Sequence, residues 1–152
     1  MTLAWRNAYD PDFLALTREL DAYFRARIGD RQNTFDLFNR PDTLCDVAVI
    51  LDGQRPVACA ALKLHPNRTA ELKRVYVQPE YRRCGLARRL VAALENRASA
   101  HGCTRMMLET NPAFQDASAV YLRLGFSPVE NFGPYQGMDT LCMGKDLMPY
   151  DD

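Results

Sequence analysis

The feature that most constrains the fold is a strand–helix–strand succession between residues 71 and 110. The run LKRVYV at 72–77 has the composition of a strand, and Pro79 ends it. A helical pattern of apolar residues follows from about Gly85 to Ala100, and TRMMLET at 104–110 indicates the next strand. Strands joined by a helical crossover run parallel, so this unit predicts a βαβ core.

The flanking segments predict further strands and helices around this core. Asp10-Pro11 is typical of a helix start, and an apolar stripe continues to a stop at Gly29. The remaining expected elements are a short helix at 31–39, a hairpin around Asp52-Gly53, a helix at 116–124, and strands at 126–130 and 139–147. We therefore expect a single α/β (α+β) domain over residues 1–152, with a mixed sheet covered by helices on both faces.

Composition excludes several classes of protein. Nineteen basic residues balance nineteen acidic ones, which argues against a nucleic-acid binder, and no apolar run approaches a membrane span. The five cysteines contain no C-x-x-C, and the two histidines lie far in sequence from any cysteine pair with ligand spacing. Neither a disulfide framework nor a metal site is expected. The N-terminus lacks the pattern of a signal peptide, so we expect a cytoplasmic protein with reduced thiols.

The junction RRCGLA, between the first parallel strand and its helix, favours an anion site. The first N–H groups of a helix have no intrahelical partner, and a phosphate can accept several of them. Gly85 and the small Ala87 would let an anion approach the backbone, while Arg82, Arg83 and Arg88 would supply charge. On chemistry alone, a glycine that merely separates strand from helix is an equal alternative. The spacing fits neither a Walker loop nor a dinucleotide fingerprint.

Two separated motifs resemble those of the GNAT superfamily of N-acetyltransferases. The pattern R/Q-x-x-G-x-G/A is occupied by Arg82, Gly85 and Ala87. Downstream, A-x-x-x-Y-x-x-x-G-F at 117–126 resembles the last helix of that family and its exit. The resemblance implies a mostly antiparallel sheet with a βαβ core, and acetyl-CoA as co-substrate without a metal.

The resemblance also implies which residues hold the coenzyme. The pyrophosphate would lie on backbone groups of the loop and helix start, and the pantetheine arm between the two parallel strands. The implied cofactor-binding residues are Val75, Val77, Arg82, Arg83, Cys84, Gly85, Leu86, Ala87, Arg88, Asn111 and Tyr121. For Asn111, ending the strand before Pro112 is an equally good role.

Acetyl transfer to an amine needs a base, an oxyanion donor and a proton for the leaving thiolate. Glu71 is the first candidate for the base, with a surface ion pair to Lys73 or Arg74 as the alternative. Glu109, a carboxylate in an apolar strand, is the second. The resemblance implies Tyr121 as the acid and the Val77 N–H as the oxyanion donor. A covalent route through Cys84 is disfavoured, because no histidine is near it in sequence.

The acceptor amine is not specified by these motifs. In this superfamily it is selected by the N-terminal helices and by the loop before the last strand, here residues 30–42 and 131–139. Both segments mix aromatic and polar side chains, which suits a small polar amine. The alternatives are a peptide or protein acceptor, and a non-catalytic acyl-CoA-binding module. An exposed last-strand edge would allow a homodimer.

Overall fold

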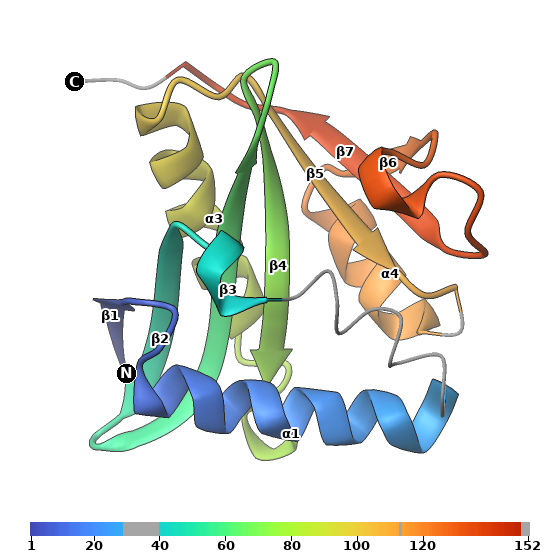
Figure 1. Ribbon diagram of the computed structural model, residues 1–152. Coiled ribbons are helices and arrows are strands. Elements are labelled where there is room, and N and C mark those ends of the chain that lie inside the picture. The colour runs from blue at the N-terminus through green and yellow to red at the C-terminus, as the bar shows by residue number, and fades with distance from the viewer. Residues whose placement is uncertain (29–39, 113, 150–152) are drawn as a thin grey trace.

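The computed structural model describes residues 1–28, 40–112 and 114–149, and its centre is a seven-stranded sheet. The strands lie in the order β1-β2-β3-β4-β5-β7-β6 (Figure 1). β4 and β5 run parallel, and the other neighbouring pairs run antiparallel. The strands are β1 Thr2–Arg6, β2 Asp46–Asp52, β3 Arg55–His65, β4 Thr69–Val77, β5 Arg105–Thr110, β6 Ser127–Val129 and β7 Leu141–Asp146. The expected mixed, mostly antiparallel sheet with a βαβ core is confirmed.

Helices cover both faces of this sheet, as expected. They are α1 Pro11–Ile28, α3 Leu86–Ala100 and α4 Gln115–Arg123, with 3-10 turns at Pro41–Thr43, Pro79–Tyr81 and Gly133–Tyr135. α1 crosses one face, and α3 and α4 lie behind the other (Figure 1). The carboxylate of Asp10 accepts the N–H of Phe13 at 3.1 Å, which confirms the predicted helix start.

Two apolar clusters join the helices to the sheet. On the α1 face, Phe13, Leu16 and Leu20 pack against β2, β3 and β4. On the opposite face, Leu90 and Leu94 belong to the cluster that α3 forms with the same strands. Alternation along the strands supplies both clusters, since neighbouring residues such as those of β2 point to opposite faces.

The first hairpin differs from its prediction by one residue. Asp52 pairs with Arg55 as the last step of the β2–β3 ladder, so the turn consists of residues 53 and 54. Gly53 has a φ of 62°, as expected of a glycine that opens a two-residue turn. The expected stop at Gly29 and the short helix at 31–39 lie outside the described residues.

β1 was not predicted from the sequence. Its five residues pair with β2 in register from Thr2↔Leu51 to Arg6↔Val47. The strand is short, and its partner lies more than 40 residues away in sequence. A local pattern carries little information about such a pairing, which tertiary structure decides.

Candidate active site

The loop between β4 and α3 carries a row of unpaired backbone donors. The first helical bond joins the N–H of Arg89 to the oxygen of Gly85 at 3.1 Å. Among the described residues, nothing accepts a hydrogen bond from the N–H groups of Arg83 to Arg88. Arg83 and Gly85 have φ angles of 64° and 79°, so the loop contains the left-handed turns that gather N–H groups into an anion nest.

Gly85 is needed in this loop for its backbone conformation. It is the N-cap of α3, and its positive φ would strain any other residue. A methyl group added there would meet no described atom within 4 Å, so the space beside the backbone is open. The N-terminus of α3 thus combines exposed donors, a helix dipole and an approachable backbone.

The two arginines of the motif and Arg88, which follows it, do not act alike. Arg82 turns back toward β4, where its Nε donates to the oxygen of Val77 at 3.0 Å. Its guanidinium also lies over the ring of Tyr23 on α1, 5.5 Å from the centroid. Arg83 and Arg88 are exposed at the surface beside the helix start. Arg82 therefore fastens the loop to the sheet, and the other two contribute positive charge near the open N–H groups.

The parallel strands separate beside this loop. Their pairing covers Thr69↔Arg105 to Glu71↔Met107 and ends there, although β4 continues to Val77. Figure 1 shows the two strands diverging toward the end where α3 begins. The N–H of Gln78 bonds to β3, so by alternation the backbone groups of Val75 and Val77 point away from β3, toward the widening gap.

A bulge in β4 sits beside this gap. The register with β3 shifts between Cys59 and Ala61, and Arg74 takes a φ of 58°. The Arg74 side chain donates to the Thr17 oxygen at 3.1 Å and pairs with Asp21 at 2.8 Å, so α1 holds the bulge in place. No local pattern in the sequence predicted this irregularity.

Tyr121 lies on α4 at the same side of the sheet as α3. Its ring packs against the cluster shared with α3 and meets Phe126 edge-on, with centroids 5.9 Å apart. Burial, with a smaller effect from Glu109, raises the pKa of the Tyr121 hydroxyl above its ordinary value. The phenol is therefore protonated at neutral pH. Asn111 is buried directly after β5.

Glu71 is buried rather than exposed, which corrects the surface ion pair considered from the sequence. Its side chain is 2% exposed and lies 2.8 Å from His65 Nε2. The Tyr135 hydroxyl donates to the other carboxylate oxygen at 2.7 Å, and Lys73 Nζ lies 3.6 Å from that oxygen. Burial alone would raise the pKa of Glu71, but His65, Lys73 and Tyr135 outweigh it and the pKa is lowered.

Glu109 is in a different environment. It is half-buried on β5 and accepts a hydrogen bond from the hydroxyl of Thr140. Burial raises the pKa of Glu109 above its ordinary value, against the lowering effects of Thr140 and Lys73. Because its pKa is raised whereas that of Glu71 is lowered, Glu109 takes up a proton more readily than Glu71 does.

The loop between β6 and β7 connects these carboxylates. Asn131 Nδ2 donates to the backbone oxygens of Tyr135 and Met138 at 3.1 and 3.0 Å, which closes the loop on itself. Tyr135 then anchors it to Glu71. This is the segment that the sequence indicated for acceptor binding, but its bonds to Glu71 and Lys73 were missed because 62–64 residues separate the partners. Most of the other indicated segment, 30–42, lies outside the described residues.

Within the described parts of the chain, no helix is both long and apolar enough to cross a membrane.

Known proteins share both the sequence pattern and the fold. The model of the acetyltransferase (GNAT) family matches residues 3–126. A Klebsiella pneumoniae protein assigned as an acyl-CoA N-acyltransferase is 31% identical over 97% of both chains, with a TM-score of 0.81. A PaiA N-acetyltransferase from Thermoplasma acidophilum, solved with coenzyme A, is 18% identical over 96% of this chain and 99% of its own, with a TM-score of 0.73.

An Azospirillum brasilense protein named IAA acetyltransferase is 35% identical over 88 residues. That alignment spans 57% of each chain, so it covers little more than half of this curated relative. The family match and the Klebsiella likeness both extend over most of the sequence. The chain therefore belongs to the GNAT acetyltransferase family.

Proposed function

We propose that this chain is an acetyl-CoA-dependent N-acetyltransferase that moves the acetyl group to the primary amine of a small molecule by direct attack. The observation that carries the proposal is the row of unpaired N–H groups from Arg83 to Arg88, next to the separating strands β4 and β5. An anion nest beside an open strand edge suits a cofactor with a pyrophosphate and a long amide-bearing arm.

The proposed contacts follow the chain from the loop into the sheet. Backbone groups of the loop and of the first turn of α3 hold the pyrophosphate. Backbone groups of Val75 and Val77 pair with the pantetheine arm as a further strand would, and Asn111 adds a polar contact from the end of β5. The N–H of Val77 points into the gap and stabilises the oxyanion of the tetrahedral intermediate.

Tyr121 is the proposed acid. Its protonated hydroxyl donates to the thiolate of coenzyme A as the tetrahedral intermediate collapses. The effect of Glu109, a residue of β5, on the pKa of Tyr121 supports this role, because it shows that the phenol lies near the proposed base. Cys84 is not needed as a nucleophile, since the amine itself attacks the thioester.

For the base, two carboxylates are assigned different tasks. Glu109 takes the proton of the incoming ammonium, directly or through water, because its pKa is raised. The hydroxyl of Thr140 donates a hydrogen bond to this carboxylate and holds it in place. Glu71, the first candidate from the sequence, holds Tyr135 and the β6–β7 loop in place, and its negative charge favours a cationic acceptor.

The test of the cofactor site is thermal unfolding with acetyl-CoA, coenzyme A, ATP and NAD in turn. A ligand at a hundred times its dissociation constant stabilises the folded state by about 2.7 kcal/mol. We expect a shift with the two forms of coenzyme A and none with ATP or NAD. The proposal fails if millimolar acetyl-CoA leaves the transition unchanged.

Turnover is tested by thiol release with two acceptor panels, one of free amines and one of peptides with free N-termini or lysines. Turnover on free amines supports the small-molecule acceptor, whereas turnover on peptides alone replaces it with a protein acceptor. Binding of acetyl-CoA without turnover on either panel would favour a non-catalytic acyl-CoA-binding module.

A further inference from the structure

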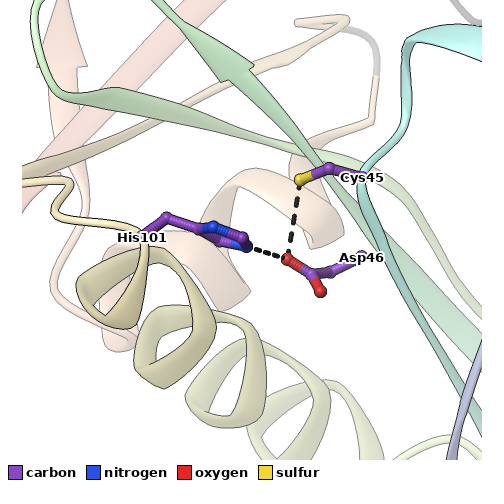
Figure 2. A group of neighbouring side chains, drawn as sticks. All are labelled: Cys45, Asp46 and His101. Carbon is purple, nitrogen blue, oxygen red and sulfur yellow. Dashed lines mark hydrogen bonds and ion pairs between the residues drawn. The ribbon is translucent and has the colours of Figure 1, made fainter.

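A cluster of three potential metal ligands lies at the opposite end of α3 from the phosphate loop. Cys45 and Asp46 stand at the start of β2, and His101 is the C-cap residue of α3. Figure 2 shows the thiol and the imidazole converging on one oxygen of the Asp46 carboxylate. His101 Nε2 is 2.6 Å and Cys45 Sγ 3.5 Å from Asp46 Oδ2. All three donor atoms lie within 4.8 Å of one another.

We propose that Cys45, Asp46 and His101 form a binding site for a divalent transition-metal ion of the zinc type. Thiolate, imidazole and carboxylate are the three donor classes that zinc takes from proteins, and here each is supplied once. Three protein ligands leave a fourth position for water. The sequence predicted no metal site, because that prediction rested on local spacing and 55 residues separate Asp46 from His101.

The distances suit such an ion with small adjustments. With metal–ligand bonds of about 2.0 to 2.3 Å, neighbouring donors of a tetrahedral site lie about 3.3 to 3.7 Å apart. The Sγ–Oδ2 separation is already 3.5 Å. The Nε2–Oδ2 separation of 2.6 Å has to open by about 1 Å. The His101 side chain is 39% exposed, so its ring has room to swing and solvent can reach the site.

The surroundings orient the carboxylate and balance the charge. Arg97 Nη1 lies 3.2 Å from Asp46 Oδ1, so the guanidinium pairs with the carboxylate oxygen that is not shared by the thiol and imidazole. Arg97 thus orients Asp46 with Oδ2 toward the thiol and imidazole, as hydrogen-bonded neighbours orient the ligands of metal sites. Without metal, the Cys45 thiol donates to Oδ2. On binding, this proton leaves to solvent, and one thiolate and one carboxylate neutralise the two positive charges of the ion.

The alternative is an ordinary ion pair that ties the end of α3 to β2 and binds no metal. Titration with Co²⁺ distinguishes the two, using the full chain freed of any affinity tag and kept reduced by a phosphine. We expect one equivalent of Co²⁺ to bind with a thiolate-to-cobalt charge-transfer absorption, and Zn²⁺ to displace it. Cys45→Ser should abolish that absorption and weaken binding at least about tenfold.

Matched variants separate the cluster from other ligands. Cys84→Ser removes the other exposed thiol among the described residues and should leave the Co²⁺ spectrum unchanged. His101→Asn keeps a hydrogen-bond donor for Asp46 but removes the imidazole, and should weaken binding about tenfold. Metal-free thermal unfolding shows whether each variant is folded, and Cys45→Ala replaces Cys45→Ser if that variant is not. A wild-type protein without the absorption, or equal Co²⁺ spectra for Cys45→Ser and Cys84→Ser, would overturn the proposal.

Discussion

At the scale of single residues, Tyr121 is the proposed acid that protonates the leaving group. Its pKa is raised by burial, so the hydroxyl keeps its proton at neutral pH. We expect Tyr121→Phe to lower kcat by about a hundredfold or more, because the thiolate then leaves unprotonated. Binding of acetyl-CoA, measured by calorimetry, should change little. Tyr9→Phe is the matched control, since Tyr9 is 63% exposed. A Tyr121→Phe enzyme with normal kcat would remove the tyrosine from the mechanism.

The two carboxylates make a second prediction at this scale. If Glu109 is the base, kcat/KM should fall as the pH drops through its pKa, which lies above that of an ordinary glutamate. Glu109→Gln should lower kcat/KM by about a hundredfold at neutral pH, and kcat/KM should then no longer fall along the acidic limb of its pH profile. Glu71→Gln should retain the acidic limb of the pH profile, because Glu71 is hydrogen-bonded to His65 and Tyr135 and is assigned a positioning role. A limb that disappears in Glu71→Gln and persists in Glu109→Gln would reverse the assignments.

At the scale of elements, two glycines flank α3 and make a matched pair: Gly85 is its N-cap, and Gly102 follows the C-cap residue His101. Gly85 and Gly102 have φ angles of 79° and 88°, and a methyl group on either meets no described atom within 4 Å. Alanine at each position should cost a similar stability of about 1 kcal/mol. Only Gly85→Ala puts a methyl group beside the unpaired N–H groups. We therefore expect only this variant to raise the KM for acetyl-CoA, by about tenfold or more, because the methyl group keeps the phosphate away from the backbone. Equal KM values for the two variants would exclude phosphate binding at this loop.

The same scale shows what the sequence could and could not predict. α1, the first hairpin and the βαβ unit were predicted because each carries its own periodicity and end signals. The loop between β4 and α3 was also predictable as a strand–helix junction, since a glycine at such a junction is a local feature; that it binds phosphate stays a prediction. The Arg74 bulge was not, because Thr17 and Asp21 hold it from α1, more than 50 residues away. The bonds of Tyr135 to Glu71 and Lys73 were missed for the same reason, since 62–64 residues separate the partners.

At the scale of the whole molecule, the buried carboxylates affect stability in opposite directions. The folded-state pKa of Glu71 is lowered, so its contribution to stability is present above its unfolded pKa and is lost as the pH falls through the folded pKa. The folded-state pKa of Glu109 is raised, so its contribution is present below the unfolded pKa and is lost as the pH rises through the folded pKa. At neutral pH, Glu71 thus stabilises the fold, whereas the buried charge of Glu109 costs stability.

This contrast gives a prediction for chemical denaturation. At pH 7, Glu71→Gln should destabilise the protein by about 3 kcal/mol, because it removes the charge of a buried carboxylate that lies 3.6 Å from the buried Lys73. Glu109→Gln should be neutral or stabilising at the same pH. Adding Lys73→Met to Glu71→Gln should recover part of the loss, since the buried charge is then removed as well. Both single variants should approach the wild type in stability as the pH falls toward the range where the carboxylates are protonated. If Glu109→Gln were the more destabilising at pH 7, the division between a structural and a catalytic carboxylate would be wrong.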